Sequence, residues 1–155
     1  MGKQSAGILL YRKTVSGIQV FLVHPGGPFF KNKDLGAWSI PKGEFLDDED
    51  PLAAAKREFE EETGQAIEGN FIKLAPVVLK SGKTVHAWAV EGDIDHQTIT
   101  SNLFEMEWPP KSGKKQTFPE IDRAGWFDLE EARVKINGAQ VGLIEEMVTI
   151  IKKPC

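Results

Sequence analysis

Cysteine is almost absent from this sequence: its 155 residues contain one, Cys155. A lone cysteine cannot form a disulfide within the chain, and it cannot build a metal site from several thiolates. We therefore expect a reducing, cytoplasmic setting.

Long apolar segments are also lacking. No stretch approaches the roughly 18 apolar residues that a membrane-spanning helix needs, and the first apolar run, GILLY, is too short for a secretory signal. We expect no membrane partner.

An excess of positive charge is missing as well. The formal net charge is −4, which does not favour a surface for DNA or RNA, so we expect no duplex nucleic acid as a partner. What the chain does have is 41% apolar residues, enough for a sizeable core at this length. We expect a single domain over residues 1–155.

Apolar runs and turn residues predict a mixed α+β domain. Strands are expected at 6–14 and 18–25, at 71–80 and 84–94 with a bend at Pro76, and at 124–127. Helices are expected at 128–136 and about 138–152. Residues 106–120 contain three prolines and three lysines, which favours a mobile loop.

A further helix is expected from Pro51 to about residue 63. Asp50 suits its N-cap, Pro51 its first position, and Gly64 the left-handed position after its end. On a 3.6-residue period its side chains divide into two faces. We expect the face with Leu52, Ala55 and Phe59 to pack on the core. The other face is not expected to pack, and it holds Ala54, Glu58, Glu61 and Glu62.

The acidic face of this helix is difficult to explain by packing alone. Glu58, Glu61 and Glu62 have spacings at which like charges repel, and they lie near the end of the helix where negative charge is unfavourable. A solvated acidic face is the ordinary interpretation, but Lys56 and Arg57 are the helix's only basic residues. Mg²⁺ or Mn²⁺ would neutralise such oxygen ligands, and these ions bind through carboxylates together with substrate phosphates. The residues therefore indicate a divalent-metal site for phosphoryl chemistry.

The segment from Gly43 to Gly64 resembles the Nudix box, G-x5-E-x7-R-E-U-x-E-E-x-G-U, in which U is a bulky apolar residue. The flanking sequences GAWSIPKGE and EIDRAGWFDLEEA also look like this family, so the resemblance covers about residues 5–135. One position departs from the pattern, because Gln65 stands where the last apolar residue is expected. The matching positions are Gly43, Glu49, Arg57, Glu58, Phe59, Glu61, Glu62 and Gly64.

The resemblance implies a fold, a reaction and a ligand set. The fold would be an α/β/α sandwich with a mixed sheet and a loop–helix–loop catalytic element at 43–65. The reaction would be hydrolysis of a nucleoside diphosphate linked to another group, X, with Mg²⁺ or Mn²⁺. Carried over by position, the metal ligands would be Glu58, Glu61 and Glu62, with the Gly43 carbonyl as a candidate fourth.

The catalytic roles are less uniform within the family. Arg57 is expected to orient a carboxylate, with Glu49 as the candidate, more than to contact the substrate. The general base in such enzymes is either a glutamate of the box or one from a later loop, so Glu58 and Glu120 are both candidates. Glu120 lies six residues before Trp126, a spacing that looks like that of diadenosine tetraphosphate hydrolases, and it is also a candidate metal ligand. An exposed loop acid is the alternative interpretation of Glu120.

Two residues are candidates for substrate binding. Lys42 precedes the box and is placed to meet a phosphate, although an ordinary surface lysine fits the sequence equally well. His24 belongs to the segment HPGGPFF, which offers backbone amides and aromatic rings for a phosphate or base pocket. The lysines of 106–120 are either a basic flap over a polyphosphate or a means of keeping the loop soluble, and the second is favoured.

These observations predict a small-molecule nucleotide as the partner. A dinucleoside polyphosphate such as diadenosine tetraphosphate is the first choice, a nucleoside triphosphate in a housecleaning reaction is the second, and a sugar nucleotide such as ADP-ribose is the third. A non-catalytic nucleotide-binding sensor is the alternative from another class. Such sensors usually lose a glutamate of the box, and this chain has lost none.

Overall fold

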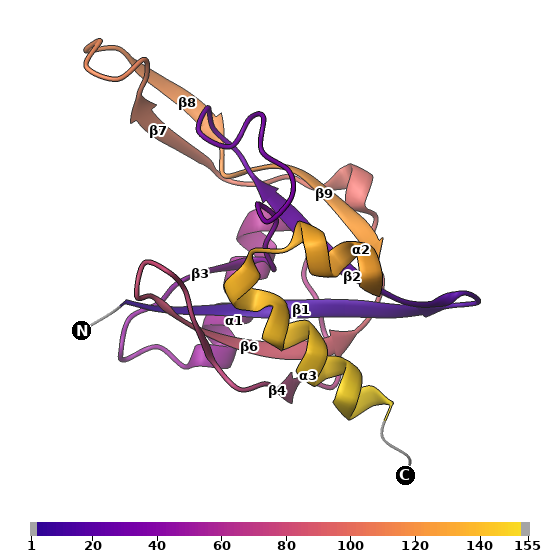
Figure 1. The fold of residues 1–155 in the computed structure, drawn as a ribbon. Helices are drawn as coiled ribbons and strands as arrows, with labels where there is room; N and C mark the ends of the chain where they lie inside the picture. Colours follow the sequence, from indigo (N-terminus) through magenta and orange to yellow (C-terminus); the bar gives the residue numbers. More distant parts are fainter. Residues whose placement is uncertain (1–2, 153–155) are drawn as a thin grey trace.

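The computed structural model describes residues 3–152, so Cys155 lies outside the described residues. A seven-stranded mixed sheet forms the centre of the molecule, and a two-stranded hairpin projects from it (Figure 1). Within residues 3–152, no helix combines the length and apolar character needed to cross a membrane.

The strand β1 (Gln4–Thr14) organises the sheet. It forms the predicted hairpin with β2 (Gly17–Pro25) and pairs in parallel with β6 (Thr84–Glu91). β9 (Ile121–Asp128) continues the sheet beyond β2, giving the order β4-β6-β1-β2-β9. Three short strands complete it: β3 (Lys42–Glu44) beside the first half of β1, and β4 (Ile72–Lys73) and β5 (Val77–Val78) beside β6.

The second strand pair is confirmed, with the interruption expected at Pro76. β4 and β5 lie on either side of this proline, and each pairs with β6 in antiparallel orientation. Because proline has no N–H to donate to a ladder, the two segments pair as separate short strands.

The predicted helix ends are confirmed in α1 (Pro51–Thr63). The Asp50 side chain accepts a hydrogen bond from the backbone N–H of Ala53 at 2.9 Å, and Gly64 has a φ of 77°. The two later helices are also found, as α2 (Leu129–Lys135) and α3 (Val141–Ile151). Short 3-10 turns occur at η1 (His96–Thr98) and η2 (Gly138–Gln140), so the last predicted helix begins with a 3-10 turn.

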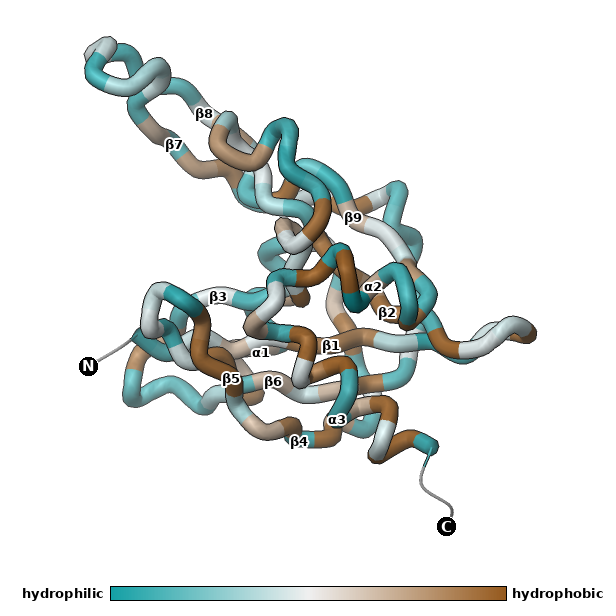
Figure 2. Tube along the Cα trace, in the orientation of Figure 1, coloured by the Kyte–Doolittle hydropathy of each residue, from teal (hydrophilic) through white to brown (hydrophobic). Residues whose placement is uncertain are grey.

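The helices cover opposite faces of the sheet. α2 and α3 cross the near face in Figure 1 and α1 lies behind it, while Figure 2 shows apolar residues concentrated on β1, β2 and α3. Successive side chains of β1 alternate between the two cores, because Ile8 and Leu10 pack with Phe59 of α1, whereas Leu9 packs with Leu143 of α3. This is the predicted α/β/α sandwich.

Residues 106–120 differ from the prediction of a mobile loop. They belong largely to a hairpin of β7 (Leu103–Glu107) and β8 (Lys115–Pro119), in which Phe104 lies opposite Phe118. The Glu107 carboxylate accepts hydrogen bonds from the backbone N–H groups of Lys111 and Gly113 and so orders the turn. The loop prediction was wrong because Pro109, Pro110 and Gly113 mark only the turn, whereas pairing between the strands determines the rest and places Pro119 in β8 opposite Leu103.

Candidate active site

The candidate site lies where the neighbours of β1 diverge. β3 pairs with one end of β1, and β2 pairs with the other end. In the chain between β2 and β3, the carbonyl of Ser39 accepts a hydrogen bond from the N–H of Val23, and the carbonyl of Pro41 accepts one from the N–H of Ile8. Between these segments and the second half of α1 is a cavity of about 140 Å³. Its polar side chains include those of Lys42, Glu62 and Glu120, and its remaining lining comes from Val23, Pro25, Ser39, Ile40 and Ile121.

Glu58 packs directly against Gly43. A Cβ atom at Gly43 would overlap the carboxylate of Glu58, so the contact requires glycine. Glu58 is 9% exposed, and burial together with the negative charge of Glu61 raises its pKa. The first residue of the box is thus placed by the backbone of β3 against an acid of α1.

Glu62 is tied to the chain on the opposite side of the cavity. Its Oε1 accepts a hydrogen bond from the backbone N–H of Lys42 at 3.2 Å. Burial raises the pKa of Glu62 to about 8, whereas burial lowers the pKa of Lys42. Both shifts favour the neutral forms, so the cost of burying these charges exceeds their mutual attraction.

Arg57 forms the predicted ion pair with Glu49. Its Nε and Nη2 donate to the two oxygens of that carboxylate at 2.9 and 3.1 Å. Its Nη1 donates to Glu58 at 2.7 Å and to Glu61 at 3.3 Å. These hydrogen bonds, led by that with Glu49, raise the pKa of Arg57. The guanidinium therefore holds three carboxylates of the box in place.

Glu120 joins the acids of the box from a different part of the chain. It lies between β8 and β9, and its backbone is fixed by hydrogen bonds with Asn102 and Gly26, both at 2.8 Å. Burial and the negative charge of Glu61 raise the pKa of its side chain. Among residues 3–152, its carboxylate has no hydrogen-bond partner.

The division of α1 into a packing and a non-packing face was wrong in part. Ala54 is fully buried in the core with Ile8 and Phe21, and Glu58 is nearly buried as well. The reason is that β1 and β2 pack against Ala54 and β3 packs against Glu58, so strands of the sheet cover this side of the helix as well. Glu60 is exposed, on the side of α1 turned away from the site.

The acids of the site do not enclose a metal ion as they stand. Over the described range 3–152, no group of three His, Cys, Asp or Glu side chains is arranged to hold one. The Arg57 guanidinium instead bridges Glu58 and Glu61. The donor set is nevertheless the hard-oxygen type that Mg²⁺ and Mn²⁺ prefer, and burial together with repulsion from Glu61 raises the pKa of Glu58. The residues therefore fit such an ion by chemistry, provided that the Nη1 group of Arg57 moves from between Glu58 and Glu61.

The two candidate substrate-binding residues lie in different surroundings. Lys42 lines the cavity. His24 is fully buried, with Nδ1 2.8 Å from Asp122 and Nε2 2.7 Å from the carbonyl of Lys33. Both ring nitrogens therefore have protein partners, and the structure does not bring His24 to the cavity. It ties the 26–37 loop to β9.

Several lining residues carry no signal in the sequence. Pro25 and Ile121 reach the cavity through an irregularity in the β2–β9 register, and Ser39 reaches it from the chain that bridges to Val23. Sequence patterns do not specify such register shifts. Only the resemblance of the segment GAWSIPKGE to the family points to Ser39 and Ile40.

Solved structures of several other proteins are similar to this chain. The Ap4A hydrolase of C. elegans, in a binary complex, has a TM-score of 0.67 at 21% identity, with 95% of this chain and 97% of that chain covered. The NUDIX domain of Shewanella oneidensis NrtR, complexed with ADP ribose, has a TM-score of 0.68 at 14% identity, with coverages of 98% and 90%. The E. coli ORF135 protein has a TM-score of 0.58 at 21% identity, with coverages of 99% and 96%. No curated protein matches.

At these identities, the structural likenesses establish the fold alone. The model of the NUDIX domain, however, matches residues 1–147, nearly the whole chain. The match includes the box, whose Glu62 lines the cavity described above and whose Arg57 holds Glu49, Glu58 and Glu61. The chain therefore belongs to the Nudix family and is a Nudix pyrophosphohydrolase.

Proposed function

We propose that this protein hydrolyses a pyrophosphate bond in a dinucleoside polyphosphate, such as diadenosine tetraphosphate, with Mg²⁺ or Mn²⁺. The observation that carries the proposal is the gathering of Glu62, Glu120 and Lys42 around one cavity, with Glu58 and Glu61 held beside it by Arg57. Such a group supplies metal ligands, a proton acceptor and a phosphate contact together.

In this proposal, Glu58, Glu61 and Glu62 hold the metal ion, with the Gly43 carbonyl as a further candidate ligand, and Glu120, also a candidate ligand, would serve instead as the base. A bound divalent ion supplies neutralisation of phosphate oxygens and a lowered pKa for water. Arg57 fixes Glu58 and Glu61 through the hydrogen bonds that it also makes to Glu49. It acts as a positioning residue.

Glu120 is the better candidate for the general base. The Glu58 carboxylate is held by a hydrogen bond from Arg57 and is a metal ligand in this proposal, so it is not free to take a proton from water. The Glu120 side chain has no such donor among the described residues, and burial raises its pKa toward the range useful to a base. Glu120 would take a proton from the attacking water.

Lys42 would meet a phosphate of the substrate. Its side chain lines the same cavity as Glu62 and Glu120, and burial lowers its pKa. Because a substrate phosphate adds negative charge there, its arrival favours the protonated amine. Lys42 would thus bind polyphosphate as a point charge.

The choice of substrate rests on two supports. The segment WSIPKG and the spacing from Glu120 to Trp126 look like those of diadenosine tetraphosphate hydrolases, and one similar fold is an Ap4A hydrolase. The similar NrtR domain is complexed with ADP ribose, which keeps a sugar nucleotide among the substrates to test. Nucleoside triphosphates are the remaining class.

A panel of nucleotides incubated with Mg²⁺, with products separated by chromatography, tests the proposal. The wild type and the Glu60→Gln variant should cleave diadenosine tetraphosphate faster than ATP or ADP-ribose, whereas Glu61→Gln should lose most activity. Glu60→Gln is the matched control, because Glu60 is exposed on the other side of the same helix. The enzyme proposal fails if no compound is cleaved while wild type and Glu61→Gln bind nucleotide alike.

A further inference from the structure

The projecting hairpin and the 26–37 loop form one unit beside the cavity. The backbone N–H of Gly26 donates to the carbonyl of Glu120 at 2.8 Å, at the base of the hairpin. Gly27 has a φ of 97°, and a Cβ atom there would lie 2.9 Å from the Phe104 ring of β7. The loop therefore packs closely on the hairpin, and His24 anchors its other end through the carbonyl of Lys33.

This unit presents an aromatic platform, which we define as Phe29, Phe30 and Trp108. The rings of Phe29 and Trp108 meet edge to face with centroids 5.3 Å apart, and Phe29 remains 58% exposed. None of the three belongs to either core cluster of the described residues. Exposed aromatic rings held in place outside the core are typical of a binding surface.

Four lysines belong to the same loop and turn as the platform residues. Lys31 and Lys33 lie on the loop, with the Lys33 Nζ 5.5 Å from the centroid of the Phe30 ring, and Lys111 and Lys114 lie on the turn of the hairpin. Within residues 3–152, none of the four is in an ion pair with an acidic side chain. The nearby Glu107 carboxylate is occupied by backbone N–H groups of the turn. Aromatic faces beside unpaired lysines match a ligand with a base and phosphates.

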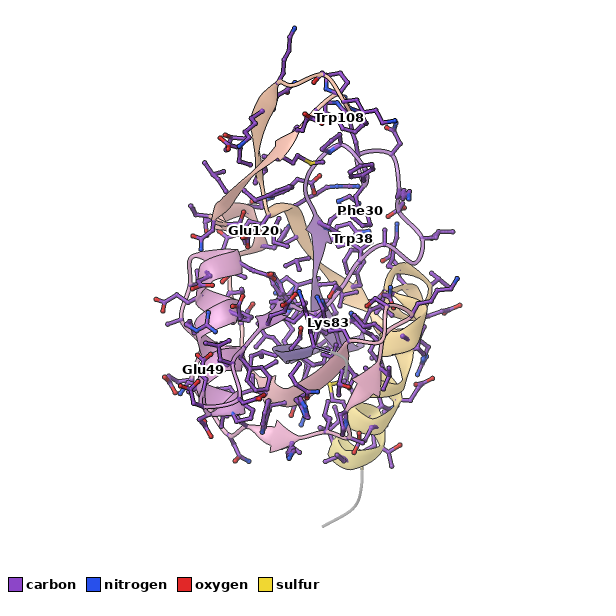
Figure 3. All side chains as sticks on the ribbon, turned by 90° about the vertical axis from the view of Figure 1, so that its left-hand side faces the viewer. Phe30, Trp38, Glu49, Lys83, Trp108 and Glu120 are labelled. Atoms are coloured by element: carbon purple, nitrogen blue, oxygen red, sulfur yellow. The ribbon has the colours of Figure 1, made fainter. Side chains whose placement is uncertain are left out.

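The platform lies at a distance from the cavity, and this distance indicates which part of a bound substrate would contact it. β8 has five residues and runs directly into Glu120, so at about 3.3 Å per residue the strand separates the turn from the cavity by about 17 Å. Trp108 lies at the far end of this strand, because its N–H donates to the carbonyl of Lys114 at 2.9 Å. In Figure 3, Trp108 lies at the outer part of the hairpin, with Phe30 below it and Glu120 at its base.

We propose that the aromatic platform and the four lysines bind the nucleoside and phosphates at the end of the substrate remote from the bond that is cleaved. The hairpin then selects dinucleoside polyphosphates over nucleoside triphosphates, because only the former carry a second base. The inference rests on the proposed function for the position of the cleaved bond, but nucleotide binding at the platform is measurable without turnover.

Calorimetric titration with non-hydrolysable analogues in the presence of Mg²⁺ tests this inference. The ligands are methylene-bridged diadenosine tetraphosphate and methylene-bridged ATP, and the variants are Phe29→Ala, Trp108→Ala and Trp108→Phe. Loss of one stacked base should raise the Kd of the dinucleoside analogue about 5- to 100-fold in both alanine variants. Trp108→Phe should stay within about threefold of wild type, and the Kd of the ATP analogue should not change.

The variants are chosen so that a folding defect does not mimic the result. Phe29 and Trp108 lie on different segments, so a damaged hairpin turn in Trp108→Ala leaves Phe29→Ala informative. Val134→Ala, which removes an exposed apolar side chain of α2, should bind both analogues as wild type does.

Three outcomes would overturn the inference. The first is an unchanged Kd of the dinucleoside analogue in the two alanine variants, and the second is an equal loss of affinity for both analogues. The third is a change of oligomeric state in size-exclusion chromatography with nucleotide Kd unaltered, which would make the platform a contact between copies of the chain. Hydrolysis of the parent nucleotide is measured in parallel. Platform-dependent binding without hydrolysis would reject the proposed function and retain the platform.

Discussion

Gly43 lies where β3 passes beneath the side chain of Glu58. The lack of a side chain allows the backbone of β3 to approach the helix closely enough to bury that carboxylate. Its φ does not lie in the left-handed region, so the need for glycine is one of space. The same residue offers its carbonyl as a candidate metal ligand, so packing and proposed chemistry depend on one position.

Replacing Gly43 with alanine should therefore damage both stability and activity. The added Cβ overlaps the Glu58 carboxylate, which must move and give up its hydrogen bond to Arg57, so the free energy of unfolding should fall by about 1 kcal/mol, and turnover should fall at least about tenfold. Urea denaturation and steady-state kinetics measure the two effects. Gly142→Ala in α3 is the control, since its Cβ meets nothing within 4 Å and alanine should stabilise the helix. If Gly43→Ala and Gly142→Ala have the same free energy of unfolding and the same turnover, the lack of a side chain at Gly43 is not needed to place Glu58.

The elements differ in how far sequence alone predicts them. The ends of α1 were predictable because Asp50, Pro51 and Gly64 act on their own neighbours. The β7–β8 hairpin was not, because its strands depend on pairing across the turn, and local residues signalled the turn alone. The burial of His24 was missed for the same reason, since its partners Asp122 and Lys33 come from distant or irregular segments.

The contribution of a single helix end to stability can be tested at the N-cap of α1. Asp50→Ala removes the hydrogen bond to the N–H of Ala53, so the free energy of unfolding should decrease by about 1 kcal/mol. Chemical denaturation of this variant and of Asp48→Ala makes the comparison, because Asp48 is exposed and precedes the helix. If both variants lose the same stability, the cap contributes nothing beyond its charge.

In the whole molecule, the sheet separates one core from the other and brings distant segments to one cavity. The resemblance supplied Glu58, Glu61, Glu62 and Glu120 as candidates, and the fold shows that burial and mutual repulsion raise the pKa of Glu58 and Glu120. Repulsion among carboxylates that Arg57 neutralises only in part destabilises the folded chain, and a bound cation would relieve it. The parallel pairing of β1 with β6, which helps to hold this arrangement, left no pattern in the sequence.

Mg²⁺ should accordingly stabilise the folded protein without any nucleotide present. At ten times its Kd, a ligand that binds only the folded state adds about 1.4 kcal/mol, which corresponds to a rise in Tm of about 3–6 °C. Differential scanning fluorimetry with Mg²⁺ followed by EDTA measures the rise and its reversal. Glu61→Gln should show a smaller rise, and Glu60→Gln should match wild type. An unchanged Tm of the wild type on addition of Mg²⁺ would contradict the proposed metal site.

In the proposed function, this fold assembles a metal-dependent hydrolase in which Glu120 accepts the proton of the attacking water. The most direct test is the kcat for diadenosine tetraphosphate at saturating Mg²⁺, compared between wild type and Glu120→Gln. Removal of a general base should lower kcat by about 10²- to 10⁴-fold. Wild-type turnover by Glu120→Gln would eliminate Glu120 as the base and contradict the account.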